Sequence, residues 1–102
     1  LVNVVGGLSM DRWASLLDYS EENLDALLAV NLKISFLTSQ AFARQLAAQD
    51  RPGSIVQIAT IAALQGMPFG AGYATAKAGL LALARTMALE WGPLGIRVNA
   101  VA

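Results

Sequence analysis

Three short runs rich in β-branched residues alternate with two long apolar stretches along this chain. The short runs lie at residues 1–5, 54–59 and 96–101, while residues 20–49 and 70–91 carry apolar side chains at helical spacing. Strands joined by crossover helices run parallel, and such crossovers are right-handed. The order therefore predicts an α/β fold, a β-α-β-α-β segment with a parallel sheet and both helices on one of its faces.

Capping and breaking residues set the expected ends of these elements. Ser20 can cap the first helix, and the acids at 21–22 favour the positive end of its dipole. The stretch 50–53 contains proline and glycine and ends this helix. Gly92-Pro93 ends the second, with a glycine that can take a positive φ and a proline that cannot continue a helix. Residues 8–19 are expected to form an irregular loop in which three apolar side chains pack locally: Trp13, Leu16 and Leu17.

The composition favours one partial domain, residues 1–102, and argues against several kinds of partner. Seven basic and seven acidic residues cancel, so nothing favours nucleic acid or an anionic membrane. Without cysteine or histidine the chain has no thiol nucleophile, imidazole base or usual zinc site. No uninterrupted apolar run reaches the ~18 residues of a membrane span, and no targeting segment is visible. We expect a piece of a longer cytoplasmic protein, without metal.

Two surfaces of the expected fold would lack cover. Parallel sheets are normally covered on both sides, yet both helices would lie on one side. Between Ala78 and Trp91 the second helix carries only two charges, at Arg85 and Glu90, so it has to bury both of its faces. A missing layer of the same chain can cover the sheet, and it is also the alternative cover for the outer face of the second helix. For the helices we expect a second subunit, in a homodimer or homotetramer formed through the two long helices.

Tyr73 and Lys77 lie four residues apart in the second helix, so their side chains share a face. A phenol with its ordinary pKa of about 10 is a poor acid or base near neutral pH, but a neighbouring cation stabilises the phenolate. The pair can therefore transfer protons. From the spacing alone, a half-buried tyrosine beside a solvated lysine is the alternative. Gly6 and Thr60 follow the first two strands, and ligands of open parallel sheets bind beyond such strand ends.

Read together, these residues make the chain resemble the short-chain dehydrogenase/reductase family along its whole length. The family's Tyr-x-x-x-Lys is present at residues 73–77, its Asn-Asn-Ala-Gly strand end at residues 3–6, and its helix asparagine at Asn31. Residues 53–60 and 95–101 also look like family signatures. The resemblance implies a doubly wound, Rossmann-like sheet. It also implies hydride transfer between the nicotinamide of NAD or NADP and a small-molecule carbonyl or alcohol.

The same resemblance implies a role for each matching residue. Tyr73 would be the general acid or base, Lys77 would lower the tyrosine pKa and hold the nicotinamide ribose, and Thr60 would bind the substrate oxygen. Asn31 would anchor a water through which protons reach Lys77. Three residues at the first strand end would contact the cofactor beside Tyr73 and Lys77: Asn3, Val5 and Gly6. The alternatives are a solvent-facing Asn31, an Asn3 satisfied by a neighbouring loop, and a Gly6 that only permits a turn.

Departures from the family pattern keep a second hypothesis open. Threonine stands at Thr60 where the family usually has serine, and Val4 replaces the second motif asparagine. The glycine-rich turn that places a pyrophosphate on a helix N-terminus is absent from these residues. The alternative is a non-catalytic relative that serves in subunit assembly or cofactor sensing. The loop at 61–69, with Leu64, Met67 and Phe69, suggests an apolar wall for a substrate of unknown identity.

Overall fold

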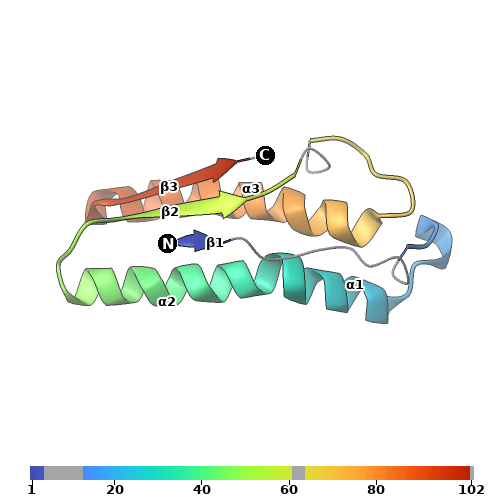
Figure 1. Ribbon diagram of the computed structural model, residues 1–102, viewed down its shortest axis with the longest axis horizontal. Coiled ribbons are helices and arrows are strands. Elements are labelled where there is room, and N and C mark those ends of the chain that lie inside the picture. The colour runs from blue at the N-terminus through green and yellow to red at the C-terminus, as the bar shows by residue number, and fades with distance from the viewer. Residues whose placement is uncertain (4–12, 61–63, 102) are drawn as a thin grey trace.

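Three parallel strands form one sheet in the computed structural model, which describes residues 1–3, 13–60 and 64–101 (Figure 1). The strands are β1 (Val2–Asn3), β2 (Gly53–Ile58) and β3 (Ile96–Val101), in the order β1-β2-β3. Val2 is paired with Val56, and Gly53 with Ile96. The expected parallel α/β sheet is confirmed.

One long helical segment joins β1 to β2, but it is not a uniform α-helix. It consists of α1 (Glu21–Leu28), a π-type turn η3 (Ala29–Lys33) and α2 (Ile34–Ala48). The Ser20 hydroxyl caps it by accepting the Asn23 N–H at 3.0 Å, as the sequence predicts. In the π-type turn the Ile34 N–H reaches back to the Ala29 carbonyl, five residues away instead of four. Helical spacing of side chains does not reveal such a turn.

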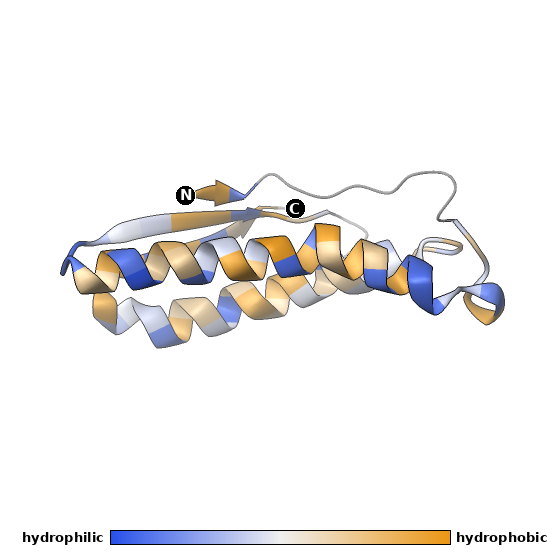
Figure 2. Ribbon diagram, turned by 90° about the horizontal axis from the view of Figure 1, so that it is seen from below, coloured by the Kyte–Doolittle hydropathy of each residue, from blue (hydrophilic) through white to orange (hydrophobic). Residues whose placement is uncertain are grey.

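The second long helix is α3 (Ala71–Trp91), and it lies on the same side of the sheet as α2 (Figures 1 and 2). Between the two helices and the sheet is the apolar core, because alternate strand side chains point toward the helices. Its buried members are Ala43, Leu46, Ile55, Ala84, Met87, Ile96 and Val98. Among the described residues no helix covers the other sheet face, where Val2 and Val101 are 59% and 53% exposed. The expected lack of cover is therefore observed.

One local expectation is wrong. Leu16 and Leu17 do not pack, because they begin a short 3-10 turn, η2 (Leu16–Asp18), that points them into solvent at 75% and 99% exposure. Gly92 does not take a positive φ: its φ is −53°, and it continues the helix into the 3-10 turn η5 (Gly92–Leu94). Without a Cβ, glycine can stay helical before proline. The left-handed residue is Gly95, with φ 81°.

Candidate functional site

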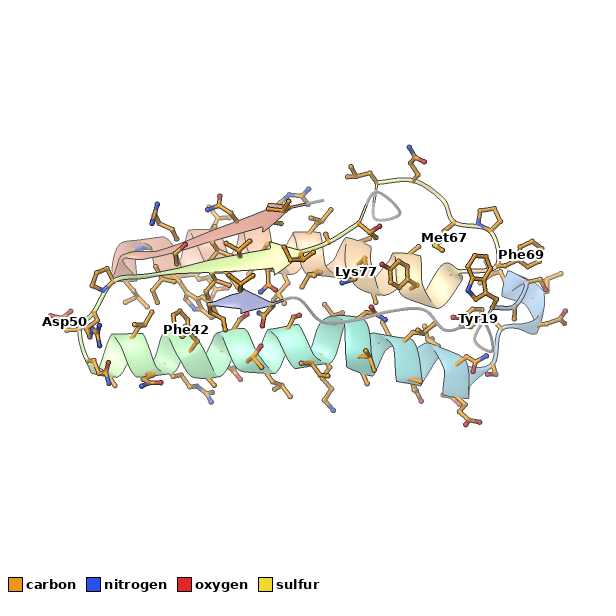
Figure 3. All side chains as sticks on the ribbon, in the orientation of Figure 1. Tyr19, Phe42, Asp50, Met67, Phe69 and Lys77 are labelled. Atoms are coloured by element: carbon orange, nitrogen blue, oxygen red, sulfur yellow. The ribbon has the colours of Figure 1, made fainter. Side chains whose placement is uncertain are left out.

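Lys77 is buried at the carboxyl end of β2. Its side chain is 4% exposed, and its Nζ donates to the Ile58 carbonyl at 3.1 Å (Figure 3). Burial lowers the pKa of Lys77 below its ordinary value of 10.5, because a desolvated ammonium loses hydration energy. The alternative of a solvated lysine is excluded. This hydrogen bond connects α3 to Ile58, the last residue of β2. Thr60 lies two residues after Ile58.

Tyr73 lies one helical turn before Lys77 and is half-buried. It belongs to the first turn of α3, whose N-cap residue is Gly70. Thr60 is also half-buried, in the segment that leaves β2. The fold therefore places Lys77 and Thr60 at the carboxyl end of β2, the edge at which open α/β sheets bind ligands, with Tyr73 one helical turn before Lys77 on α3. Such a set can donate hydrogen bonds to a bound oxygen and move a proton to or from it.

Asn31 lies within the π-type turn and is fully buried, so the solvent-facing alternative is excluded. Its Nδ2 donates to the Leu27 carbonyl at 3.0 Å. The neighbouring Leu32 packs against Gly79 on α3, since a Cβ at Gly79 would lie 3.2 Å from Leu32 Cδ2. Because Gly79 is only two residues beyond Lys77, this contact holds the π-type turn beside the part of α3 that carries the lysine.

The Asn3 side chain is occupied by a buried polar network between β1, β2 and α2. Its Nδ2 donates to Ser39 Oγ at 3.0 Å and to Gln57 Oε1 at 3.1 Å. Its Oδ1 accepts from Thr38 Oγ1 at 3.0 Å, and Gln57 Nε2 donates to Ser39 Oγ at 2.7 Å. Asn3, Ser39 and Gln57 are all buried. Among the described residues the partners of Asn3 thus lie on α2 and β2, whereas the alternative expected a neighbouring loop. Whether Asn3 also binds a cofactor stays a prediction.

Sequence reasoning missed the partners of Asn3, although a signal was present. Asn31, Ser35 and Ser39 recur every four residues on a helix that is otherwise apolar on that side, and Gln57 interrupts a β-branched strand. Polar residues at core positions of both elements indicate a shared hydrogen-bond network. Ser35 Oγ is buried and makes no hydrogen bond within the described ranges.

Val5 and Gly6, like the motif departure Val4, are outside the described residues. In the loop before α3, Leu64 and Phe69 are 66% and 56% exposed, so they are available to an apolar ligand. Over residues 1–3, 13–60 and 64–101, no group of three acidic side chains gathers to hold a metal ion.

Comparison with known families gives a match over the whole chain. The family described as "Enoyl-(Acyl carrier protein) reductase" matches residues 1–102. A (3R)-3-hydroxyacyl-CoA dehydrogenase from Rattus norvegicus is 42% identical over 95 residues, which are 93% of this chain and 36% of the relative. A 2-dehydro-3-deoxy-D-gluconate 5-dehydrogenase from Escherichia coli is 34% identical over 97% of this chain and 39% of its own length. The chain therefore spans little more than a third of these relatives.

Solved structures share the fold at similar identity. A 4-hydroxyisoleucine dehydrogenase complexed with NADH superimposes with a TM-score of 0.91 at 30% identity, over 99% of this chain and 43% of that one. An Agrobacterium tumefaciens protein with bound NADP gives a TM-score of 0.93 at 40% identity, over 99% and 40% of the two chains. Both neighbours are thus complexed with a nicotinamide cofactor.

Proposed function

Because this chain belongs to the short-chain dehydrogenase/reductase family, we propose that its parent protein is an NAD(P)-dependent oxidoreductase. It interconverts a carbonyl and an alcohol, with Tyr73 as the general acid or base. The observation that carries this proposal is the buried Lys77, fixed on the Ile58 carbonyl one helical turn after Tyr73. A charge buried at a ligand-binding sheet edge costs free energy, so a catalytic use explains it better than a structural one.

The donor set fits the nicotinamide half of the cofactor. A lysine ammonium and a tyrosine hydroxyl at the carboxyl edge can donate to the hydroxyls of a ribose. The bound nicotinamide supplies a hydride to a carbonyl carbon or accepts one from an alcohol carbon. Val5 and Gly6 are proposed to contact the cofactor from the end of the first strand. Asn3, whose side chain is occupied by hydrogen bonds to α2 and β2, is proposed to contribute by holding that strand end in place. The fit supports NAD and NADP equally.

The chain's own residues handle the substrate oxygen and its proton. In carbonyl reduction Tyr73 gives its hydroxyl proton to the oxygen as the carbon gains the hydride. The resulting phenolate is stabilised by the Lys77 ammonium, and the reverse reaction returns the proton. Thr60 orients the oxygen by donating its hydroxyl hydrogen. Asn31, buried in the π-type turn beside the Lys77 part of α3, holds a water that passes protons to Lys77.

Turnover by the full-length protein and its Tyr73→Phe variant tests this proposal. The screen pairs NADH and NADPH with ketones, and NAD and NADP with secondary alcohols, including hydroxyacyl-CoA thioesters and sugar acids like those of the relatives. Tyr73→Phe should abolish turnover while cofactor binding, followed by nicotinamide fluorescence, stays within about threefold. Arg85→Gln, an exposed position further along α3, is the matched control. Wild-type turnover in Tyr73→Phe would refute the role of Tyr73.

The non-catalytic alternative rests on the threonine at Thr60 and on Val4. Threonine keeps the hydroxyl of the usual serine but adds a methyl group and a stiffer χ1. Thr60→Ser should therefore retain turnover, whereas Thr60→Ala should lose it. Any turnover that depends on Tyr73 excludes the alternative. Cofactor binding without turnover on any substrate of the screen would favour it.

The apolar outer surface of the helices supports a homo-oligomer. By length and composition alone, the helical segment Glu21–Ala48 is apolar enough to cross a membrane. Only 28% of its most apolar window is buried, so much of this apolar surface is exposed in the single chain. Between α2 and α3 lies a groove of about 400 Å³. Its lining includes Phe36, Gln40, Arg44, Leu83, Glu90 and Trp91. The opposite charges of Arg44 and Glu90 in one groove suit a second copy of this chain, because a two-fold axis can pair each with the other.

Light scattering of the full-length protein tests this assembly. Leu37 is 49% exposed on α2, and Leu37→Glu should shift a dimer or tetramer toward smaller species. Arg44→Glu should do the same, and combining it with Glu90→Arg should restore the assembly. A monomeric wild type, or wild-type protein that sediments with phosphatidylcholine vesicles, would contradict the proposal.

The absence of cysteine in this chain supports the further proposal of a reducing, cytoplasmic location.

A further inference from the structure

Within the part of the chain that the structure describes, the hydroxyl of Tyr19 is buried without a hydrogen bond. Tyr19 ends the 3-10 turn before α1, where its N–H donates to the Leu16 carbonyl at 3.3 Å. Its Oη is shielded from solvent and has no partner within the described ranges. Because burying an unpaired hydroxyl is unfavourable, phenylalanine would suit this position better on stability grounds alone. The oxygen therefore calls for another reason.

That oxygen lies against the first turn of α3, at the residue before Tyr73. A Cβ on Gly72 would overlap Tyr19 Oη, would lie 3.0 Å from Tyr19 Cζ, and would lie 2.9 Å from Leu27 Cδ1. Gly72 itself is buried. Only a glycine lets the phenol approach the helix backbone this closely. The Tyr19 hydroxyl thus fills the space that a side chain at position 72 would occupy.

The residues next to the first turn of α3 in the sequence do little to hold this turn in place. Its N-cap residue Gly70 has no side chain with which to cap the helix. The preceding Phe69 has a left-handed backbone, with φ 65°, which is unusual for a bulky residue. Its carbonyl accepts the Ala14 N–H at 3.1 Å. The segment that carries Ala14 and Tyr19 therefore holds both the loop before α3 and its first turn (Figure 3).

We propose that Tyr19 is a positioning residue for Tyr73, acting through the contact of its hydroxyl with the Gly72 backbone. The inference rests on the proposed function, since it assumes that Tyr73 transfers the proton. Tyr19 does not touch the reacting atoms. It fixes the position of the first turn of α3, and with it the position of the Tyr73 phenol. Small shifts of an acid or base lower the rate of the chemical step more than they weaken substrate binding.

A double-mutant cycle in the full-length protein tests the proposal. Gly72→Ala should lower kcat by at least tenfold, because the new methyl displaces the first turn of α3, with KM changed by less than threefold. Tyr19→Phe should lower kcat by about threefold without reducing the thermal midpoint. Combining the two should recover at least half of the kcat lost in Gly72→Ala, since the methyl then occupies the space of the missing oxygen. Ala82→Ser, which adds one atom at an exposed position further along α3, is the matched control.

The outcomes of this cycle distinguish a positioning role of Tyr19 from a structural one. Recovery of kcat in the double variant supports the proposal. Multiplicative losses of kcat, or recovery confined to the thermal midpoint, would overturn it, because the contact would then be merely structural. A wild type without turnover on any substrate would count against the proposed function instead. The 19–72 contact would still be measured by the coupling of the two substitutions in unfolding. If Gly72→Ala does not fold, Leu27→Val in combination with it removes the second close contact and allows the cycle to be run.

Discussion

Replacing Asn3 with alanine should reduce stability far more than cofactor affinity. The Asn3 side chain makes three hydrogen bonds, and Gln57 Oε1, fully buried, would lose the donor that Asn3 provides. Leaving one buried acceptor unpaired costs about 1–3 kcal/mol, and each further lost hydrogen bond costs about 1 kcal/mol. Thr38 limits the loss because its hydroxyl can keep the Ile34 carbonyl at 2.9 Å. We expect the free energy of unfolding to fall by about 3 kcal/mol.

The measurement is urea unfolding of the full-length protein at one fixed protein concentration, since an oligomer's stability depends on concentration. Nicotinamide fluorescence gives the cofactor Kd of the same samples, which should change by less than threefold. Gln45→Ala removes an amide from the exposed side of α2 and is the matched control. Thr38→Val removes a single bond to Asn3 and should cost about 1 kcal/mol. An unchanged unfolding midpoint together with a tenfold weaker Kd would refute the reasoning and make Asn3 a cofactor ligand.

Three further predictions follow from single residues. Burial lowers the pKa of Lys77, so as the pH rises the folded chain releases this proton before the unfolded chain does. The free energy of unfolding should therefore rise with pH between the lowered pKa and 10.5. Urea titrations at several pH values should show that Lys77→Met removes this rise. Ser20→Ala removes the cap on α1 and should cost about 1 kcal/mol in urea unfolding, with Ser54→Ala outside any helix as the comparison. Gly95→Ala should cost about 1–2 kcal/mol because φ is 81° there, whereas Gly66→Ala, with open space at its Cβ, should cost less.

The order and type of the main elements follow from side-chain periodicity. Leu27, Ala43 and Leu46 recur at helical spacing and are buried, as amphipathic helices on a sheet require. The β-branched run of β2 gives Ile55, which is fully buried. The Ser20 cap also follows from local chemistry. Such features are set by neighbours within a few residues, so sequence reasoning reaches them.

Features set by contacts between distant segments were not predictable in the same way. The Asn3 network joins residues 36 and 54 positions apart, and the sequence offers only isolated polar residues as a hint. Leu16 and Leu17 are apolar, but the residues next to them in the sequence do not indicate whether another segment of the chain packs against them. For the site, the burial of Lys77 and Asn31 needed the packed fold. Their catalytic roles come from the family resemblance and stay predictions.

The π-type turn at Ala29–Lys33 has a geometric consequence for the whole first helix. In a regular α-helix, residues four apart advance by about 40° around the axis, so a row from Leu27 to Ala43 would wind by about 160° and leave the sheet. The wider turn takes up part of this advance, and every fourth residue along the row stays buried. If the same residues formed a regular α-helix instead, all that follows would rotate by about 100° about the helix axis. Ser39 would then turn away from Asn3, so the turn acts as a phase adjustment that keeps both ends of one helix in register with one sheet.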